Sequence, residues 1–319
     1  MAGLFEVPGC DKCKHPAIYH QIYSGRMMCG KHLAESIEKK TSKELRKQLT
    51  IPKGQNFTIL VAISGGKDSA VLLERIVGAI GKRPDVTIIG GCVDEGIEGY
   101  RPPSLECARQ LCLDLGVRFE TVSYPELGFK EMDEVVVRME ELSESKAPCS
   151  FCGVFRRQGI NHLARRVNAD VIALGHNLDD MAQTILMNLQ NGDLERTLRL
   201  APHTSSPIEG IAPRIVPLRW IPEQEIHLYA LHRGLPIHHE ECPHGSGALR
   251  FRHREMIAWM EADVPGTRHG LLRMADDVKA LHSKAGANRP PSPKNCPICG
   301  EICSGTICKG CEMKKLLFD

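Results

Sequence analysis

The chain has little of what would mark a membrane protein, a secreted protein or a general nucleic-acid binder. Its 319 residues include 41 basic and 39 acidic side chains, a formal balance of +2, far from the strongly basic totals of general nucleic-acid binders. No apolar run approaches the roughly 18 residues of a membrane-spanning helix, and the first residues show no basic stretch followed by an apolar one. We therefore expect a cytoplasmic protein without a membrane partner, in which any RNA site is a local patch.

Cysteine, by contrast, is abundant. The chain has 14 cysteines, and in a cytosolic protein such a number indicates metal binding or thiol chemistry rather than disulfides. Three of them lie within residues 10–29, five within 296–311, and the remaining six within 92–242. The chain therefore has a middle and two cysteine-rich ends.

Both ends carry pairs of ligand residues separated by two others, the spacing typical of tetrahedral zinc sites. The predicted ligands of one zinc ion are Cys10, Cys13, Cys29 and His32, and those of a second are Cys296, Cys299, Cys308 and Cys311. Segments this short have too little core to fold without a metal. We therefore predict two Zn2+ ions; rubredoxin-like iron and unligated thiols are the alternatives, and the role of Cys303 stays open.

Changes in composition predict five segments along the chain. We expect an N-terminal zinc finger at residues 1–36, a basic connector at 37–56, a catalytic domain at 57–285, a proline-rich linker at 286–295 and a C-terminal zinc ribbon at 296–319. The connector is rich in lysine, and its pattern favours the exposed face of a helix slightly over a contact with RNA. The linker contains three prolines and a glycine, a composition typical of a semi-stiff spacer.

Within the predicted catalytic domain, short β-branched apolar runs alternate with segments of helical period, the pattern of parallel strands joined by crossover helices. The predicted strands are residues 58–63, 86–93, 118–122 and 171–174, and the predicted helices are 69–80, 104–115, 131–142, 155–167 and 178–190. This succession predicts an α/β fold with a doubly wound parallel sheet. Such sheets bind ligands at the carboxyl ends of their strands, so we expect the chemistry in the loops after Ile63, Val93 and Leu174.

A glycine-rich anion site follows the first predicted strand directly. It consists of Ser64, Gly65, Gly66, Lys67, Asp68 and Ser69. The two glycines let the backbone approach an anion, the start of the next helix directs N–H groups at it, and the serine and lysine side chains add donors. A polyphosphate is the natural ligand. The loop is not a Walker P-loop, because Val61 and Asp68 stand where that motif needs glycine and serine or threonine.

The run Ser-Gly-Gly-Lys-Asp-Ser after a strand resembles the PP-loop ATP pyrophosphatases, enzymes that cleave ATP between its α and β phosphates. The resemblance implies that residues 64–69 bind ATP with a Mg2+ ion beside it, and that Asp68 helps to hold the metal and its phosphates. It places further ATP contacts at Val93, Asp94, Gly175 and His176. Asp180, which follows in the next helix, is assigned a catalytic role, although a carboxylate of the first helical turn is the alternative.

Two thiols in the middle of the chain have the spacing of a metal or redox pair. Cys149 and Cys152 lie three positions apart, just before a predicted helix, so both side chains can reach one metal or each other. Together with Cys242 they would suffice to hold a [4Fe-4S] cluster and leave one iron free for the sulfur to be transferred. The pattern itself leaves three interpretations open: cluster ligands, a persulfide or disulfide relay, and an inert or structural-zinc role.

From the first cysteine pair through the PP-loop to the last pair, the chain resembles the tRNA 2-thiouridine synthetases of the TtuA type and their eukaryotic cytosolic counterparts. The resemblance implies that Cys242 joins Cys149 and Cys152 as a ligand of a [4Fe-4S] cluster. It also implies that Arg156 assists catalysis. It further implies tRNA as the substrate, a ubiquitin-like thiocarboxylated protein as the sulfur donor, and a homodimer.

The expected activity is ATP-dependent 2-thiolation of a uridine in tRNA, which would make the chain a tRNA sulfurtransferase. The uridine C2 oxygen would attack the α phosphate of ATP and release pyrophosphate; sulfur would then replace the adenylated oxygen and release AMP. The alternatives are another PP-loop tRNA-modifying enzyme, a cytidine 2-thiolase or a lysidine synthetase, and a non-catalytic zinc-finger RNA-binding protein. The two zinc sets disfavour the first, and the intact phosphate loop with the three middle cysteines disfavours the second. These motifs are shared by enzymes of the wobble uridine and of the T-loop uridine.

Overall fold

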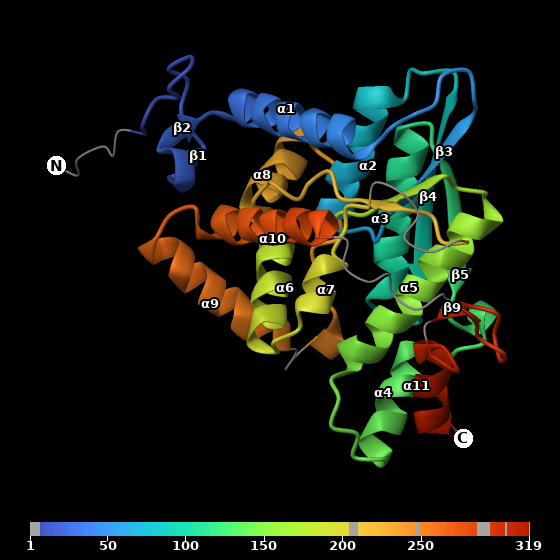
Figure 1. Ribbon diagram of the computed structural model, residues 1–319. Coiled ribbons are helices and arrows are strands. Elements are labelled where there is room, and N and C mark those ends of the chain that lie inside the picture. The colour runs from blue at the N-terminus through green and yellow to red at the C-terminus, as the bar shows by residue number, and fades with distance from the viewer. Residues whose placement is uncertain (1–6, 204–209, 246–248, 286–293, 304, 319) are drawn as a thin grey trace.

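The protein is represented by a computed structural model, which describes residues 7–203, 210–245, 249–285, 294–303 and 305–318. Most of the predicted proline-rich linker, residues 286–293, lies outside these ranges. A five-stranded parallel sheet forms the centre, with helices on both sides (Figure 1). None of the helices in the described ranges is both long enough and apolar enough to cross a membrane.

The strands of the central sheet run parallel in the order β5-β4-β3-β6-β7. They are β3 (Phe57–Ala62), β4 (Val86–Asp94), β5 (Arg118–Ser123), β6 (Val171–Ala173) and β7 (Arg214–Ile215). The predicted doubly wound sheet is confirmed, and its order reverses between β3 and β6, so their carboxyl ends form the topological switch point where such sheets bind ligands. Strand β7 was not predicted, because two residues are too few to show a period.

Helices cover both faces of the sheet, because alternate residues of a strand point to opposite sides. Ile59 and Val61 of β3 pack in one apolar cluster with four helices, and Leu60 packs in a second cluster with three others. The first group is α1 (Gly30–Gln48), α2 (Lys67–Ile80), α3 (Arg101–Asp114) and α8 (Glu223–Arg233). The second is α4 (Met132–Glu141), α5 (Pro148–Arg166) and α11 (Lys309–Phe318). Two helical layers thus enclose the sheet.

Helix α5 begins earlier than predicted. The predicted start is Phe155, but the helix starts at Pro148. Proline is favoured in the first turn, because the N–H that it lacks would have no helical partner there. Gly153 weakens the helical signal of the stretch between them. Cys149 and Cys152 therefore lie in the first two turns of α5, and the expectation that this pair precedes a helix was wrong.

Helix α1 joins the first cysteine-rich end to the sheet layers. It starts within the predicted zinc finger and ends within the predicted connector (Figure 1). Leu33, Ile37 and Leu45 are buried at spacings that place them on one side of the helix, while Lys43 and Lys47 are exposed. Lys43 and Lys47 of the connector are therefore on the solvent face of an amphipathic helix, whereas Lys40 lies 3.0 Å from the buried Glu225.

A further group of helices extends from the edge of the sheet. It consists of α6 (Leu178–Gln190), α7 (Leu194–Leu198), α9 (Leu249–Asp263) and α10 (Thr267–Lys284). Met181 and Ile185 of α6 pack with Leu272 of α10 in a separate apolar cluster, and α9 lies against α6 (Figure 1). The two cysteine-rich ends add one hairpin each, formed by β1 (Tyr19–Gln21) with β2 (Arg26–Met28) and by β8 (Lys294–Asn295) with β9 (Ile302–Cys303).

Candidate active site

The phosphate loop connects the carboxyl end of β3 to the amino end of α2. Gly65 has a φ of 87°, and a Cβ at this position would lie 2.0 Å from the carbonyl oxygen of Ser104, so only glycine fits. The Ser69 hydroxyl donates to the Gly66 carbonyl at 2.9 Å and accepts from the Ser64 N–H at 3.1 Å. These bonds close the loop around the N–H groups that open α2, which is the geometry of an anion site.

The loop after β6 meets the phosphate loop at the switch point. A Cβ on Gly175 would lie 3.2 Å from the carbonyl carbon of Asp68, so the two loops touch. The Asn177 side chain donates to the Asp68 carboxylate at 2.9 Å and accepts from the N–H of Asp180 at 2.9 Å, which caps α6. Burial raises the pKa of Asp68, and the Lys67 ammonium and the Asn177 amide oppose the rise. Asp68 is thus held in place at the loop, with a carboxylate available to a hard cation.

Asp180 has two structural partners. One carboxylate oxygen accepts from the Asn177 N–H at 3.3 Å and completes the capping box, and the other lies 3.0 Å from Nη1 of Arg250. Arg254, which lies on α9 like Arg250, is 3.3 Å from Glu223, so both arginines are directed at the site. The capping interpretation of Asp180 is confirmed, and its catalytic role stays a prediction.

A cavity of about 510 Å³ opens beside the phosphate loop, and residues of the loop, α8 and α9 line it. Nζ of Lys67 lies 2.7 Å from Glu223 and 3.1 Å from Asp68. Burial alone would raise the pKa of Glu223, but Lys67 and Arg254 hold it below its usual range. A polyphosphate that enters this cavity would therefore meet two cations, Lys67 and Arg254, whose positions are fixed by carboxylates.

The segment that carries Cys242 starts at the phosphate loop. The N–H of His238 donates to the carbonyl of Gly65 at 2.9 Å, and the His238 ring packs edge-on against Tyr100 with centroids 5.4 Å apart. Residues 237–241 line the same cavity. Cys242 thus lies four residues after His238, whose backbone contacts the phosphate loop.

The three middle cysteines converge at the amino end of α5. Sγ of Cys149 lies 3.9 Å from the carbonyl oxygen of His244, two residues beyond Cys242, and the 3-10 helix Pro243–Gly245 packs against α5. Cys152 and Cys242 border the same apolar cluster. Burial raises the pKa of Cys242, and the sulfurs of Cys152 and Cys149 raise it further because they are close. The structure therefore brings Cys242 to the Cys149 and Cys152 pair.

These three sulfurs are spaced more widely than the cysteines at the ends. In the described ranges only the two terminal sets have three or more ligand atoms within 4.8 Å of one another. A [4Fe-4S] cluster is larger than a single ion, so its ligands stand farther apart. Nη2 of Arg156 lies 3.6 Å from Sγ of Cys152, and Arg156 and Arg250 oppose the rise in pKa that burial gives Cys149. Three converging thiols beside two fixed cations fit the ligand set of such a cluster.

The other predicted ATP contacts lie at the carboxyl ends of β4 and β6. Val93 is buried and its carbonyl accepts from Arg101, and the Asp94 carboxylate accepts from the N–H of Gly96 at 3.0 Å. His176 is exposed on the switch-point loop. The placement agrees with the ligand-binding edge of a doubly wound sheet, while the contacts with ATP stay predictions.

Both terminal sets are assembled as single-ion sites. At the amino end, the sulfurs of Cys13 and Cys29 lie 3.6 Å apart, and Nδ1 of His32 lies 3.3 Å from the sulfurs of Cys10 and Cys29. At the carboxyl end, the sulfurs of Cys299 and Cys308 lie 3.4 Å apart. Sulfurs bound to one tetrahedral zinc would be about 3.8 Å apart, so both sets fit that ion.

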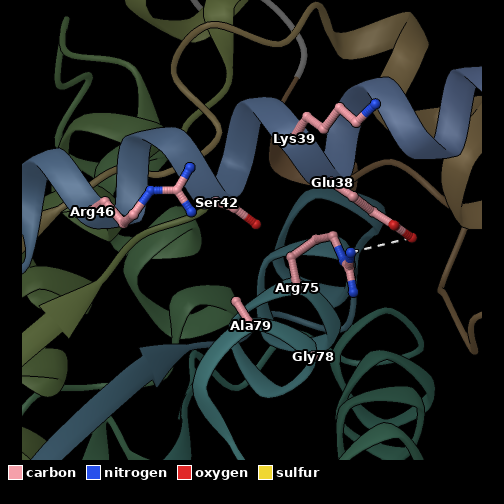
Figure 2. A pocket seen from close by; sticks show the side chains of 7 residues that line it. All are labelled: Glu38, Lys39, Ser42, Arg46, Arg75, Gly78 and Ala79. Atoms are coloured by element: carbon pink, nitrogen blue, oxygen red, sulfur yellow. Dashed lines mark ion pairs between the residues drawn. The ribbon is translucent and has the colours of Figure 1, made fainter.

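A second cavity, of about 430 Å³, lies between α1 and α2 (Figure 2). Glu38 and Arg75 face each other there as an ion pair of 3.2 Å, and Arg46 approaches from the next turns of α1. Two of the three α2 residues that line it, Gly78 and Ala79, belong to the last turn, where the helix dipole disfavours a phosphate. The chemistry therefore belongs to the first cavity, at the opposite end of α2.

Several residues of the site were not predicted. Tyr100, Glu223 and His238 line the first cavity, and Glu95 and Arg101 form a buried pair next to the phosphate loop. Glu95 directly follows the end of β4, a position that indicates chemistry in such sheets, so the sequence contained a signal for it. Glu223 and His238 belong to no motif, and only the fold brings them to the loop.

Comparison with known proteins agrees with this geometry. A family model described as a PP-loop domain matches residues 34–241. The tRNA 2-thiolation protein NcsA of Haloferax volcanii is 35% identical over 318 residues, covering 95% of this chain and 97% of the relative. The cytoplasmic tRNA 2-thiolation protein 1 of Mus musculus is 34% identical over 309 residues, covering 96% of this chain and 72% of the relative.

A solved structure extends the likeness to three dimensions. The U34-tRNA thiolase NcsA from Methanococcus maripaludis, with its [4Fe-4S] cluster, is similar over 98% of this chain and 97% of its own, at 30% identity and a TM-score of 0.80. The phosphate loop, the doubly wound sheet and these near full-length relatives lead to one assignment. The chain belongs to the PP-loop family and, within it, to the tRNA 2-thiolation proteins.

Proposed function

We propose that this protein uses ATP to replace the C2 oxygen of the wobble uridine of tRNA, position 34, by sulfur. The name of its structural relative, a U34-tRNA thiolase, supports position 34, and the names of its sequence relatives support 2-thiolation. One observation carries the proposal: residues 238–242 connect the phosphate loop to the three middle cysteines. At one end of this segment the N–H of His238 donates to the Gly65 carbonyl, and at the other end is Cys242. An activated oxygen and a sulfur-holding site can thereby meet at one uridine. The relatives also make the cytoplasm the expected location.

In the activation step, residues of the phosphate loop bind and orient ATP. The N–H groups at the start of α2 and the Lys67 ammonium bind the outer phosphates, and Asp68 binds a Mg2+ ion. The uridine C2 oxygen attacks the α phosphorus, and pyrophosphate leaves. Donors fixed before the reaction stabilise the charge that develops on the leaving group.

In the sulfur step, Cys149, Cys152 and Cys242 hold the [4Fe-4S] cluster, which when bound supplies an iron atom without a protein ligand. Arg156 balances negative charge beside Cys152, and Asp180 positions Arg250 next to the thiols. The sulfur nucleophile adds to C2 of the adenylated uridine, the C2–O bond breaks, and AMP leaves with the oxygen. Bound tRNA must cover the site, because water would otherwise hydrolyse the adenylate.

The terminal sets have a structural role in this proposal. Each holds one Zn2+ ion, which folds its segment and fixes the helix that follows or precedes it. A homodimer and a ubiquitin-like thiocarboxylated sulfur donor complete the expected assembly. Sedimentation analysis and thiolation with such a carrier in place of free sulfide check these two partners.

The decisive experiment is a single-turnover thiolation assay. Anaerobically purified protein, loaded with iron and sulfide, is incubated with ATP, Mg2+, sulfide and a tRNA that has an unmodified wobble uridine. Nucleoside mass spectrometry should find 2-thiouridine at position 34, formed in step with AMP and pyrophosphate. Asp68→Ala should abolish all three products without changing the melting temperature, and Asp114→Ala, at an exposed position of α3, is the matched control.

Two outcomes would contradict the proposal. Pyrophosphate release with a modified cytidine would assign the chain to another PP-loop tRNA-modifying activity. Normal thiolation by iron-free protein would show that the cluster takes no part in the mechanism. The three cysteines would then be a persulfide relay or packing residues.

A further inference from the structure

A buried arginine connects the phosphate loop to the end of β4. The Arg101 side chain, 3% exposed, donates through Nη1 to the carbonyl of Ser64 at 2.9 Å and through Nη2 to the carbonyl of Val93. Its Nε lies 2.7 Å from Oε2 of Glu95. Arg101 therefore fixes the first residue of the phosphate loop, and Glu95 balances the charge of Arg101.

The same glutamate also faces the cysteine site. Oε1 of Glu95 lies 3.6 Å from Nε of Arg156, and Nη2 of Arg156 lies 3.6 Å from Sγ of Cys152. The Glu95 side chain is only 6% exposed, whereas that of Arg156 is half exposed. An uninterrupted set of polar contacts thus runs from the Ser64 carbonyl through Arg101, Glu95 and Arg156 to the Cys152 sulfur.

From this arrangement we propose that Glu95 is a positioning residue that couples the ATP site to the cysteine site. Its single carboxylate balances two guanidinium groups, one of which holds the phosphate loop and the other a sulfur. The inference rests on the proposed function, because it takes the three middle cysteines to be the cluster ligands. It goes beyond that function by predicting that ATP and the cluster each affect the binding of the other, with Glu95 as the group they share.

The sign of the coupling follows from the charges. Three thiolates add negative charge beside Arg156, so they attract this guanidinium and leave the Glu95 carboxylate to Arg101 alone. Arg101 then holds the Ser64 carbonyl more firmly, and the phosphate loop is better ordered for its ligand. A filled cysteine site should therefore increase the affinity for ATP, and by linkage ATP should affect the cluster equally.

The test measures binding of a non-hydrolysable ATP analogue by calorimetry, in cluster-loaded and in metal-free protein. In the unmodified protein the loaded form should bind at least about fivefold more tightly, the lower end of typical coupling between two sites. In Glu95→Gln, which keeps the shape but removes the charge, the ratio should fall to near one. Glu98→Gln, three residues away at an exposed position, should keep the full ratio.

Two further measurements keep the coupling testable if Glu95→Gln folds poorly. Arg156→Met changes the half-exposed end of the network, leaves the buried pair in place, and should abolish the ratio even if Glu95→Gln folds poorly. The spectrum of the reduced cluster in electron paramagnetic resonance should change when the analogue is added to the unmodified protein, but not in either variant. Protein that takes up no iron would contradict the proposed function itself. A loaded protein whose ratio and spectral change survive both substitutions, or are absent before them, would overturn the coupling alone.

Discussion

The cysteines at the two ends of the chain differ from those in the middle in spacing, burial and neighbours. Each end gathers its ligand atoms within 4.8 Å of one another, and five of their seven cysteines are buried, with Cys13 half-buried and Cys299 exposed. Cys149 is exposed and Cys152 and Cys242 are half-buried, and Cys242 directly follows the residues that line the ATP cavity. Tight, mostly buried sets suit a structural ion, while a wider and more open set leaves room for a reacting group.

One thiol in each terminal set has a lowered pKa, whereas burial and neighbouring sulfurs raise the pKa of Cys299 and Cys311, and that of Cys13 is also raised. Burial raises the pKa of Cys10, but backbone N–H groups outweigh it and bring the pKa to about 6; Cys296 behaves in the same way. Burial raises the pKa of Cys149 and Cys242, and no comparable lowering brings them back. The end segments therefore already offer a thiolate to an ion, whereas the middle thiols depend on the bound group and on Arg156 for their charge.

Removal of a middle cysteine should have the largest effect on activity. Cys242→Ser should lower thiolation by about a hundredfold or more, since even an outer-shell partner of a metal can supply that much. The melting temperature should change by less than about 2 °C, because the residue is half-buried and lies outside the packed core. Nucleoside mass spectrometry and calorimetry measure the two quantities. Full thiolation, or a large loss of stability, would place Cys242 among the structural cysteines.

The converse change removes a ligand from the carboxyl-terminal set. Cys296→Ser should lose one zinc ion per chain and make residues 294–318 sensitive to protease, because this segment has little core of its own. Thiolation should fall by less than about tenfold, since α11 only supports α4 and α5 from outside. Metal analysis and limited proteolysis give the readout. Loss of iron with retained zinc would reverse the assignment of the two classes.

A smaller effect is expected where the carboxyl-terminal ribbon docks on α5. Arg165 lies 2.7 Å from the buried Glu301 of the ribbon, and Arg165 itself is 44% exposed. Solvent weakens the pair, so Arg165→Gln should cost about 1 kcal/mol and lower the melting temperature by about 2–4 °C. Lys130→Gln, which breaks an exposed pair with Glu134, is the control and should cost less than about 0.5 kcal/mol. Equal effects of the two substitutions would show that the ribbon is not fixed through this pair.

The smallest effect should come from the fifth cysteine of the ribbon. Cys303 donates to the carbonyl of Gly305 at 3.4 Å and lies outside the four-ligand set. Cys303→Ser should leave both the zinc content and the thiolation rate unchanged, as determined by metal analysis and the nucleoside assay. A drop in zinc content would show that Cys303 replaces one of the four assigned ligands.

Local patterns predicted much of the fold, because β3 and β4 contain apolar, β-branched runs and the phosphate loop is a contiguous motif. Both terminal ligand sets were predicted for the same reason, because each consists of pairs of ligand residues separated by only two others in the sequence. The start of α5 was missed because Gly153 hides the helix that Pro148 begins. Glu223 and His238 reach the site only through tertiary packing, which no local pattern encodes.

Diffraction recorded at the iron and zinc absorption edges, from anaerobically grown crystals with a bound ATP analogue, would identify the metal at each of the three cysteine sets. We predict an iron peak among the sulfurs of Cys149, Cys152 and Cys242, next to the cavity that holds the analogue, and one zinc peak at each end of the chain. Zinc at the middle cysteines, or iron at the ends with none in the middle, would contradict the account.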